Sequence, residues 1–454
     1  MVFLKKKCEA RSILDPQSTM PYDCSMKPRL VSSIIIGLIH LPVIGAGMKE
    51  MNPPLEPDPS QVTALVGGRL IDGHGGEAVE NAIVVIRGSQ IVQAGPMSEL
   101  EIPEGARLVN TGGHSILPGL MDTHFHSRDS VEIPIEYELE KGITSFRDPG
   151  HPFKYYIVPL LSQANLPRIF LCGGHLDGID PIHRDQAIRV ESVKHAKQAV
   201  GWHVKRGASA IKVYFMLPLE HIAATCEAAN EHGVLVTAHL ELVDADDAIR
   251  AGVRGMEHVT SFGTALADPD DAAHYKKEVR ADPNQRRPLR PWLWSRIDLH
   301  NNPRLQPLLD LIVETSTFVS PTVDIFEARA GEKGFTQEQE DGFRTMLNFI
   351  GLCHKAGAKI TVGSHTGAPF AERGYAFQRE MELLVDAGMT PLEVITSATK
   401  TGAEFFGIEE RLGTLEAGKT ADLILVKGNP DKDITVMRNV SRVMLNGSWV
   451  YDTD

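Results

Sequence analysis

Cysteine is scarce in this chain, with five residues among 454. Cys8 and Cys24 fall in an N-terminal stretch that we expect to be absent from the mature protein. The other three, Cys172, Cys226 and Cys353, are an odd and widely spaced set. This spacing provides neither a disulfide framework nor a C-x-x-C zinc site. We therefore predict that they are buried free thiols.

Runs of lysine and arginine are missing beyond the N-terminus, and the formal net charge is -13. A nucleic-acid-binding protein would present a basic face to the phosphate backbone. The charge balance therefore argues against a nucleic-acid partner, and we interpret the acidity as a contribution to solubility alone. A chain of this length can form one large barrel or several domains.

The N-terminal region contains an apolar run from Leu30 to Gly47, which is short for a membrane-spanning helix and is interrupted by Pro42. Lys27 and Arg29 precede it, and small residues close it. A basic start, an apolar middle and a small-residue end are typical of a secretory signal. We predict that residues 1–47 are an N-terminal extension with a signal peptide and that the protein is exported, to the periplasm or the extracellular space. An uncleaved membrane anchor remains the alternative.

Both ends of the predicted mature chain are rich in short β-type runs separated by Gly, Asp and Asn. After a linker at residues 48–61, such runs fill residues 62–115 and again residues 411–454. Alternating apolar runs bounded by turn residues predict strands. We therefore expect one small β-sandwich built from the two ends.

The long middle of the chain, residues 116–410, alternates strand-like and helix-like segments. One helix start is marked by Thr390, Pro391 and Glu393, a capping box with proline at the first helical position. About eight strand–helix repeats predict an α/β fold with a closed, parallel (β/α)8 TIM barrel. Such barrels carry their chemistry at the carboxyl ends of the strands.

The first strand of this barrel is predicted at Ile116 to His126, ILPGLMDTHFH, and ends in two histidines. His124 and His126 share a face, because alternate residues of an extended strand point the same way. Two neutral imidazoles at one strand end are suitable metal ligands. Further polar residues follow the later strands, namely Asp148, His175, Lys212, His239, His258 and His365.

These motifs resemble those of the amidohydrolase superfamily of metal-dependent hydrolases, and especially its imidazolonepropionase-like and prolidase-like branch. The resemblance rests on LPGLMDTHFH near the start and on ATKTGAEFFGIEERLGTLEAGKTADLILVKGNP, from Ala398 to Pro430. It extends from Val62 to the C-terminus. It implies metal-dependent hydrolysis of a peptide or amide C–N bond, in a dipeptide or an N-acyl amino acid, by a metal-bridging hydroxide.

The resemblance also implies a ligand set. In the family pattern, His124 and His126 match the first metal pair, and His239 and His258 match ligands on the fifth and sixth strands. Lys212 matches a lysine that takes up CO2 and becomes a carbamate bridging two divalent ions, here expected to be zinc. The alternative interpretation of Lys212 is the unmodified ammonium of an ordinary ion pair.

His365 departs from the family pattern, which has an aspartate at this position. An imidazole can bind a metal and can act as a general base near neutral pH. It brings no negative charge, however. Three alternatives follow: His365 replaces the aspartate in both roles; His365 binds the metal while Asp177 or Asp180 moves the proton; or the chain is a catalytically degenerate metal-binding barrel.

Substrate contacts are predicted on the loops after the strands, at Tyr214, His175, Arg147 and Asp177. The charged segment at residues 263–308 contains Arg290, Trp292 and Trp294 and is interpreted as a long binding loop or lid. A solvated insertion without substrate contact is the alternative. Arginine beside indole suits a carboxylate next to an apolar group. A small molecule is the expected partner, and a homo-oligomer is left open. Hydrolysis of a cyclic amide or a lactone is a further alternative, since it uses the same machinery.

Overall fold

The computed structural model describes residues 49–127, 136–153, 166–366, 372 and 374–453. The predicted signal peptide and extension lie outside these ranges, so export stays a prediction. Within the described ranges, no helix is both long and apolar enough to cross a membrane. Cys172, Cys226 and Cys353 are buried and unpaired, which confirms the prediction of free thiols.

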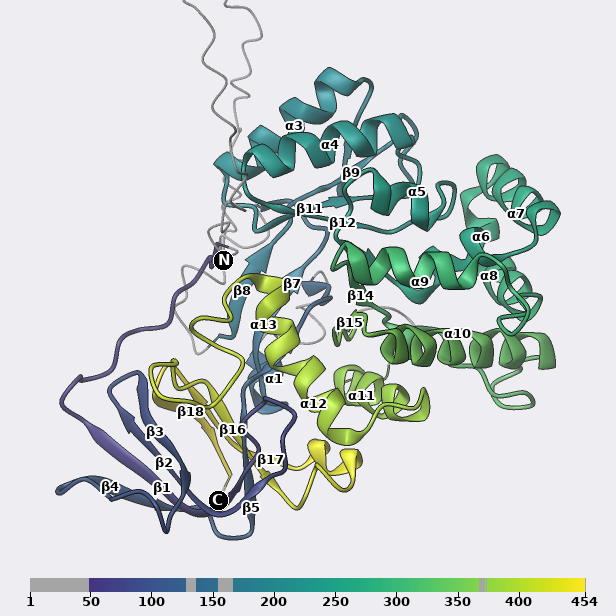
Figure 1. Ribbon diagram of the computed structural model, residues 1–454. Coiled ribbons are helices and arrows are strands. Elements are labelled where there is room, and N and C mark those ends of the chain that lie inside the picture. Colours follow the sequence, from purple (N-terminus) through teal and green to yellow (C-terminus); the bar gives the residue numbers. More distant parts are fainter. Residues whose placement is uncertain (1–48, 128–135, 154–165, 367–371, 373, 454) are drawn as a thin grey trace, which may run out of the picture. The chain divides into compact units, whose positions relative to one another are not determined.

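The two ends of the described chain form one eight-stranded sheet, in the order β18–β17–β16–β5–β1–β2–β3 with β4 beside β1. Strand β5 pairs in parallel with β1 and antiparallel with β16, so N-terminal and C-terminal segments lie side by side (Figure 1). This confirms the prediction that both ends build one β-rich part. Its strands are β1 (Val62–Leu70), β2 (Val79–Arg87), β3 (Gln90–Pro96), β4 (Arg107–Asn110), β5 (His114–Pro118), β16 (Leu423–Lys427), β17 (Val440–Leu445) and β18 (Ser448–Asp452).

The middle of the chain forms the predicted (β/α)8 barrel. Its strands pair in parallel within two sheets. The backbone N–H of Ser209 donates to the carbonyl of Leu171 at 2.6 Å, and that of Thr123 donates to Val362 at 3.0 Å, so the third strand joins the fourth and the first joins the last. The barrel strands are β6 (Leu120–Asp122), β7 (Ile143–Asp148), β8 (Arg168–Leu171), β11 (Ala210–Val213), β12 (Leu235–Ala238), β13 (Gly255–Glu257), β14 (Phe318–Ser320) and β15 (Lys359–Ile360). Two short strands, β9 (His175–Asp177) and β10 (Ala187–Arg189), extend the sheet beside β11.

The stretch expected as the first barrel strand is in fact two strands. Strand β5 ends at Pro118 in the terminal sheet, and β6 begins at Leu120 in the barrel. Gly119 between them has no space for a side chain, since a Cβ there would lie 2.2 Å from Oγ1 of Thr144. The domain boundary expected between residues 115 and 116 therefore falls inside β5.

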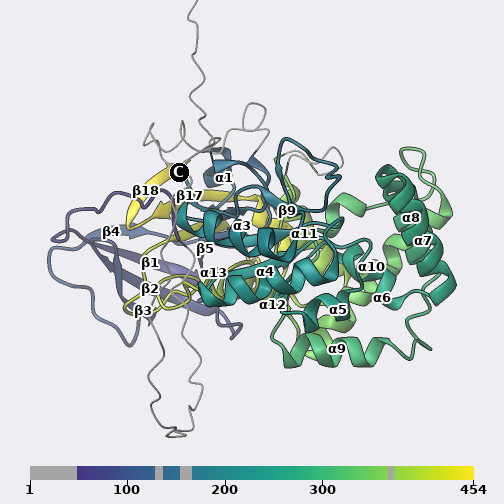
Figure 2. The same ribbon diagram turned by 90° about the horizontal axis from the view of Figure 1, so that it is seen from above.

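Helices cover the barrel strands. Helices α3 and α4 lie side by side (Figure 2). The predicted capping box is present at the start of α12, where the Thr390 N–H donates to Oε2 of Glu393 at 2.7 Å. The helices are α1 (Glu136–Glu140), α3 (Val193–Lys205), α4 (Leu219–Glu231), α5 (Ala245–Arg250), α9 (Leu305–Glu314), α10 (Gln337–Ala356), α11 (Ala376–Asp386), α12 (Pro391–Ala398) and α13 (Lys400–Phe406), with 3-10 turns η5 (Val323–Phe326) and η6 (Ile434–Arg438).

The segment at residues 263–308 is largely helical, so its interpretation as a long loop was wrong. It contains α6 (Gly263–Leu266), α7 (Pro269–Ala281), η4 (Pro283–Gln285) and α8 (Arg286–Ser295), preceded by the 3-10 turn η3 (Val259–Phe262). Asp268 caps α7 and Pro269 occupies its first turn, a favourable helix start. Trp294 of α8 is fully buried and packs near Gly263. Helix α8 also packs against α10 and is thereby held beside the barrel.

Candidate active site

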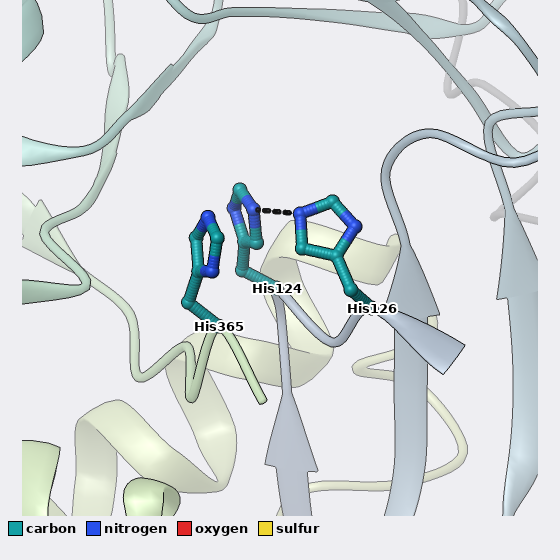
Figure 3. Close-up of side chains that lie close together, drawn as sticks. All are labelled: His124, His126 and His365. Carbon is teal, nitrogen blue, oxygen red and sulfur yellow. Dashed lines mark hydrogen bonds between the residues drawn. The ribbon is translucent and has the colours of Figure 1, made fainter. Parts of the chain in front are cut away.

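Three of the predicted metal ligands lie together at one end of the barrel. His124 and His126 follow β6, and His365 follows β15. Nε2 of His124 is 3.2 Å from Nε2 of His126, and the His365 ring stacks on that of His124 with centroids 4.8 Å apart (Figure 3). One nitrogen from each of the three lies within 4.8 Å of the others. This arrangement can hold one metal ion.

Glu257, which the sequence analysis missed, fixes the orientation of His124. Its Oε2 lies 2.5 Å from Nδ1 of His124. A proton on Nδ1 faces the carboxylate and leaves the lone pair of Nε2 directed toward His126. A carboxylate behind a ligand histidine in this way orients the ring and raises its basicity. Burial favours the protonated form of Glu257, but Arg147, Lys212 and His124 outweigh it and hold the pKa of this carboxyl well below its usual range.

The backbone explains why Glu257 escaped notice. It directly precedes the predicted ligand His258, and neighbours on a strand normally point to opposite faces. His258, however, has a φ of 63°, so the chain turns sharply where β13 ends. Both residues consequently approach His124, whose ring centroid lies 4.7 Å from that of His258. The sequence did contain one signal for Glu257, which is that it is an acidic residue directly beside the predicted ligand His258.

The environment of His365 fits a metal ligand. Its backbone is left-handed, with a φ of 46°, and its N–H donates to the carbonyl of His124 at 2.7 Å. Its Nδ1 is buried and has no hydrogen-bond partner among the described residues. An orphaned buried nitrogen carries a free-energy cost that a bound cation would remove.

All three histidines are held in the form that binds metals. Burial lowers the pKa of His124 to about 4, although Glu257 acts in the opposite direction. Burial, and then the neighbouring histidines, hold the pKa of His126 and of His365 well below the usual value. At neutral pH the imidazoles are therefore uncharged, as metal binding requires.

The other three predicted ligands lie nearby but outside this cluster. The His239 and His258 ring centroids are 4.5 Å apart, and Nδ1 of His258 lies 2.6 Å from Oγ1 of Thr322. Nζ of Lys212 lies 3.6 Å from Oε1 of Glu257. Burial lowers the pKa of Lys212 to about 8, against the influence of Glu257. The carbamate and the second ion stay predictions.

A second group surrounds His126. One ligand atom each from His126, Asp148 and His151 lies within 4.8 Å of the other two. Asp148 is buried and accepts hydrogen bonds from the backbone N–H groups of Ser127 and Gly150, both at 3.0 Å. Asp148 therefore ties the chain after β6 to the end of β7 and keeps His126 in place.

Two of the predicted substrate residues line the same end of the barrel. The Tyr214 ring lies 4.5 Å from that of His175 and 4.6 Å from that of His239, between centroids. Burial raises the pKa of Tyr214 to about 12, so its hydroxyl stays protonated and can donate a hydrogen bond. Nε2 of His175 is buried without a hydrogen-bond partner in the described ranges. Contact of both residues with substrate stays a prediction.

Asp177 and Arg147 form hydrogen bonds mainly with other residues of the chain. Oδ1 of Asp177 accepts the N–H groups of Gly178 and Met216, both at 2.9 Å, and burial raises the pKa of Asp177 to about 7. Arg147 is completely buried and donates to Oε1 of Glu257 at 2.5 Å. Arg147 thus positions Glu257, while the predicted contacts of Arg147 and Asp177 with substrate are untested.

Two arginines of α8, one turn apart, reach the same region. Arg290 donates to Oε1 of Glu241 and, at 2.9 Å, to Nε2 of His239. Arg286 is buried and lies over the Phe215 ring, 5.4 Å from its centroid. It forms no ion pair with a carboxylate of the described residues, and its Nε has no partner there. Its Nη1 donates to the carbonyl of Pro283 at 2.5 Å, so Arg286 is a buried cation whose charge no carboxylate of the described residues neutralises.

A surface cavity of about 480 Å³ lies elsewhere, between α5, α7 and α9. Two ion pairs lie in its walls, Lys276 with Asp244 at 2.6 Å and Arg250 with Asp246 at 3.8 Å. It contains none of the histidines described above. We therefore place the chemistry at the barrel end.

Comparison with known proteins agrees with this geometry. The amidohydrolase family model matches residues 115–450, which is most of the chain. The chain belongs to the amidohydrolase family. This confirms the resemblance seen in the sequence.

Individual relatives are distant. An adenine deaminase of Mesorhizobium japonicum is 23% identical over 364 residues, covering 79% of this chain and 53% of the relative. The chain thus spans about half the length of this relative. A 5-methylthioadenosine/S-adenosylhomocysteine deaminase of Symbiobacterium thermophilum is 23% identical over 455 residues, covering 86% of this chain and 93% of the relative. The crystal structure of a Xaa-Pro dipeptidase with bound methionine superposes with a TM-score of 0.66 at 23% identity, covering 87% of this chain and all of that one. At this identity the likeness establishes the fold.

Proposed function

We propose that this amidohydrolase cleaves the amide bond of a small molecule that carries a free carboxylate, such as a dipeptide or an N-acyl amino acid. The observation that supports hydrolysis is the cluster of three neutral histidines, His124, His126 and His365. The observation that supports a carboxylate is Arg286, a buried guanidinium without an ion-pair partner among the described residues.

A divalent ion, which we propose to be zinc, would be held by His124, His126 and His365, and when bound it supplies a Lewis acid and lowers the pKa of water. Glu257 keeps the Nε2 lone pair of His124 directed into the site. The Tyr214 hydroxyl, kept protonated by burial, donates a hydrogen bond to the oxygen of the amide carbonyl as negative charge develops there.

The Arg286 guanidinium sits one side-chain layer from the histidines. Phe215 separates it from His239, whose ring centroid is 5.8 Å from that of Phe215. A guanidinium binds a carboxylate through two parallel hydrogen bonds, which orients the substrate as well as attracting it. We assign Arg286 to the carboxylate of the substrate, in place of the role that the sequence suggested for Arg290.

Deamination is the second candidate, because two of the relatives are named as deaminases of adenine or of adenosine derivatives. An aminopurine carries no carboxylate for Arg286. Hydrolysis of a cyclic amide or a lactone is a third candidate, since the same histidine cluster would serve it. A catalytically degenerate barrel is the fourth, and it depends on the histidine at position 365.

A substrate panel separates these candidates. Zinc-loaded protein would be assayed with dipeptides and N-acyl amino acids, with the same compounds as C-terminal amides, and with adenine and lactones. For the wild type, we expect hydrolysis of the free acids and a kcat/KM for the C-terminal amides that is at least about tenfold lower. We expect Arg286→Met to abolish this difference by raising KM for the acids. The exposed Arg287→Gln on the same helix is the matched control. Turnover of adenine or lactones alone would contradict the proposal, and so would equal rates for acids and amides.

A further inference from the structure

We infer that the Arg290 guanidinium occupies the position of the second metal ion, so that this chain binds one ion where the resemblance implies two. The inference rests on the proposed function, in that the first ion binds at His124, His126 and His365. It concerns the neighbouring position, to which the family pattern assigns His239, His258 and a carboxylated Lys212.

The metal-binding nitrogen of His239 is already engaged. Nη2 of Arg290 and Oε1 of Glu241 each lie 2.9 Å from Nε2 of His239. A zinc ion would need to lie about 2.0–2.1 Å from that nitrogen. Nε2 of His239 either donates a proton to Glu241 or accepts from Arg290, and in both cases it has no lone pair free for an ion. The guanidinium beside it and a metal cation cannot share the position.

Arg290 is firmly held in this place. Nε of Arg290 donates to Oε1 of Glu241 at 3.0 Å, and Nη2 donates to the same oxygen. The hydroxyl of Tyr275 donates to the other oxygen of Glu241. Glu241 and Tyr275 are buried, and the Phe326 ring lies beneath the guanidinium at 5.6 Å from its centroid. Displacing Arg290 would leave the Glu241 carboxylate buried without a cation, which is strongly unfavourable.

The bridging residue fits a site that lacks the second ion. Lys212 is buried with its Nζ 3.6 Å from Oε1 of Glu257, the oxygen that also accepts from Arg147. An ammonium group suits this neighbour. Without a second ion to neutralise it, a carbamate would place an uncompensated anion beside Glu257, and like charges at such a distance repel strongly in a buried site. Lys212 therefore fits an ordinary ion pair, the second interpretation that its sequence position allowed.

The ligands of the first position do not depend on Arg290. His124 is oriented by Glu257, and the cluster of His124, His126 and His365 contains neither His239 nor Lys212. A chain that replaces the second ion by an arginine keeps a fixed positive charge there without requiring a bridging anion. The single-ion site and the histidine at position 365, where the family pattern has an anionic aspartate, are thus consistent with each other.

The test is the number of zinc ions per chain, measured by elemental analysis after equilibration with excess zinc and bicarbonate and removal of free metal. We expect one ion for the wild type and for the control Arg287→Gln. The double variant Arg290→Met/Glu241→Gln removes the Arg290–Glu241 ion pair without leaving either charge buried alone. We expect this variant to bind close to two zinc ions per chain.

Each other outcome has a definite meaning. Two ions on the wild type, or one ion on a folded double variant, would overturn the inference while leaving the proposed function intact. No ion on the wild type would overturn both. Should the double variant fail to fold, 13C NMR of the wild type in labelled bicarbonate still decides: we expect no carbamate signal, and a carbamate signal that appears with zinc would overturn the inference.

Discussion

Glu257 touches three groups on which the site depends. Its two oxygens contact Nδ1 of His124 and a guanidinium nitrogen of Arg147, both at 2.5 Å, and Nζ of Lys212 lies 3.6 Å away. One carboxylate thus orients a metal ligand and pairs with two buried cations. Removing its charge should affect both metal affinity and stability.

We predict that Glu257→Gln weakens zinc binding about 10- to 100-fold, because the residue behind a ligand histidine sets its tautomer and basicity. We also expect a loss of about 3–5 kcal/mol in the free energy of unfolding, since Arg147 and Lys212 lose their partner. Zinc affinity would be measured by competition with a chelator, and stability by urea unfolding. The exposed Glu220→Gln serves as control. Unchanged zinc affinity would show that His124 does not depend on Glu257.

Residues of the site that belong to a sequence motif could be predicted, whereas residues whose direction depends on the folded backbone could not. His124 and His126 were predicted because alternate residues of a strand share a face, and His365 because the resemblance places it where the family has an aspartate. The structure brings the three together. Glu257 was missed because the turn at His258 changes the direction of its side chain. Arg286 was missed because its segment was interpreted as a loop, so no face of a helix was assigned.

At the scale of elements, helix α1 buries a carboxyl group against the terminal sheet. Glu138 is buried on α1, which contacts β7, β17 and β18. Burial, reinforced by Asp122 and opposed by Lys141, raises the pKa of Glu138 to about 8. The folded protein therefore prefers a proton on this group, whereas the unfolded chain releases it near pH 4.5.

This pKa shift predicts the pH dependence of stability. The contribution of Glu138 is fully present below about pH 4.5 and is lost as the pH rises toward 8, because the unfolded state releases the proton first. Glu138→Gln cannot ionise, so its advantage over the wild type in the free energy of unfolding should grow over that interval, to the order of a few kcal/mol. Urea unfolding at about pH 5 and about pH 8 measures it. Glu140→Gln on the same helix is the control, and an advantage that is equal at both pH values would refute the assignment.

Elements with strong local signals were predicted correctly, and those that depend on tertiary packing were not. The capping box of α12 identified its first turn from Thr390 and Glu393 alone. Helix α8 carries three arginines and two prolines at residues 286–295 and belongs to the segment that was interpreted as a binding loop or lid. Its helical state depends on burial of Leu293 and Trp294 beside α10, which no local pattern indicates.

At the scale of the whole molecule, a buried ion pair joins the terminal sheet to the barrel. Arg168 of β8 donates through Nε to Oδ2 of Asp422 at 2.7 Å, and its Nη1 donates to Oε1 of Glu50 at 2.8 Å. The sequence predicted the barrel and a β-rich part formed from both ends. It did not predict that the chain passes from the terminal sheet into the barrel at Gly119, because the close packing of Gly119 depends on Thr144 of a different strand.

The central claim is that a metal ion at His124, His126 and His365 enables this barrel to hydrolyse an amide bond. The most direct measurement is the rate of hydrolysis of the best acid of the panel by chelator-treated protein as zinc is returned in steps. We predict that activity is lost on chelation and rises linearly to a plateau at one equivalent of zinc, and that His126→Ala abolishes the recovery. Equal activity with and without zinc, or no activity at any zinc concentration on any compound of the panel, would contradict the account.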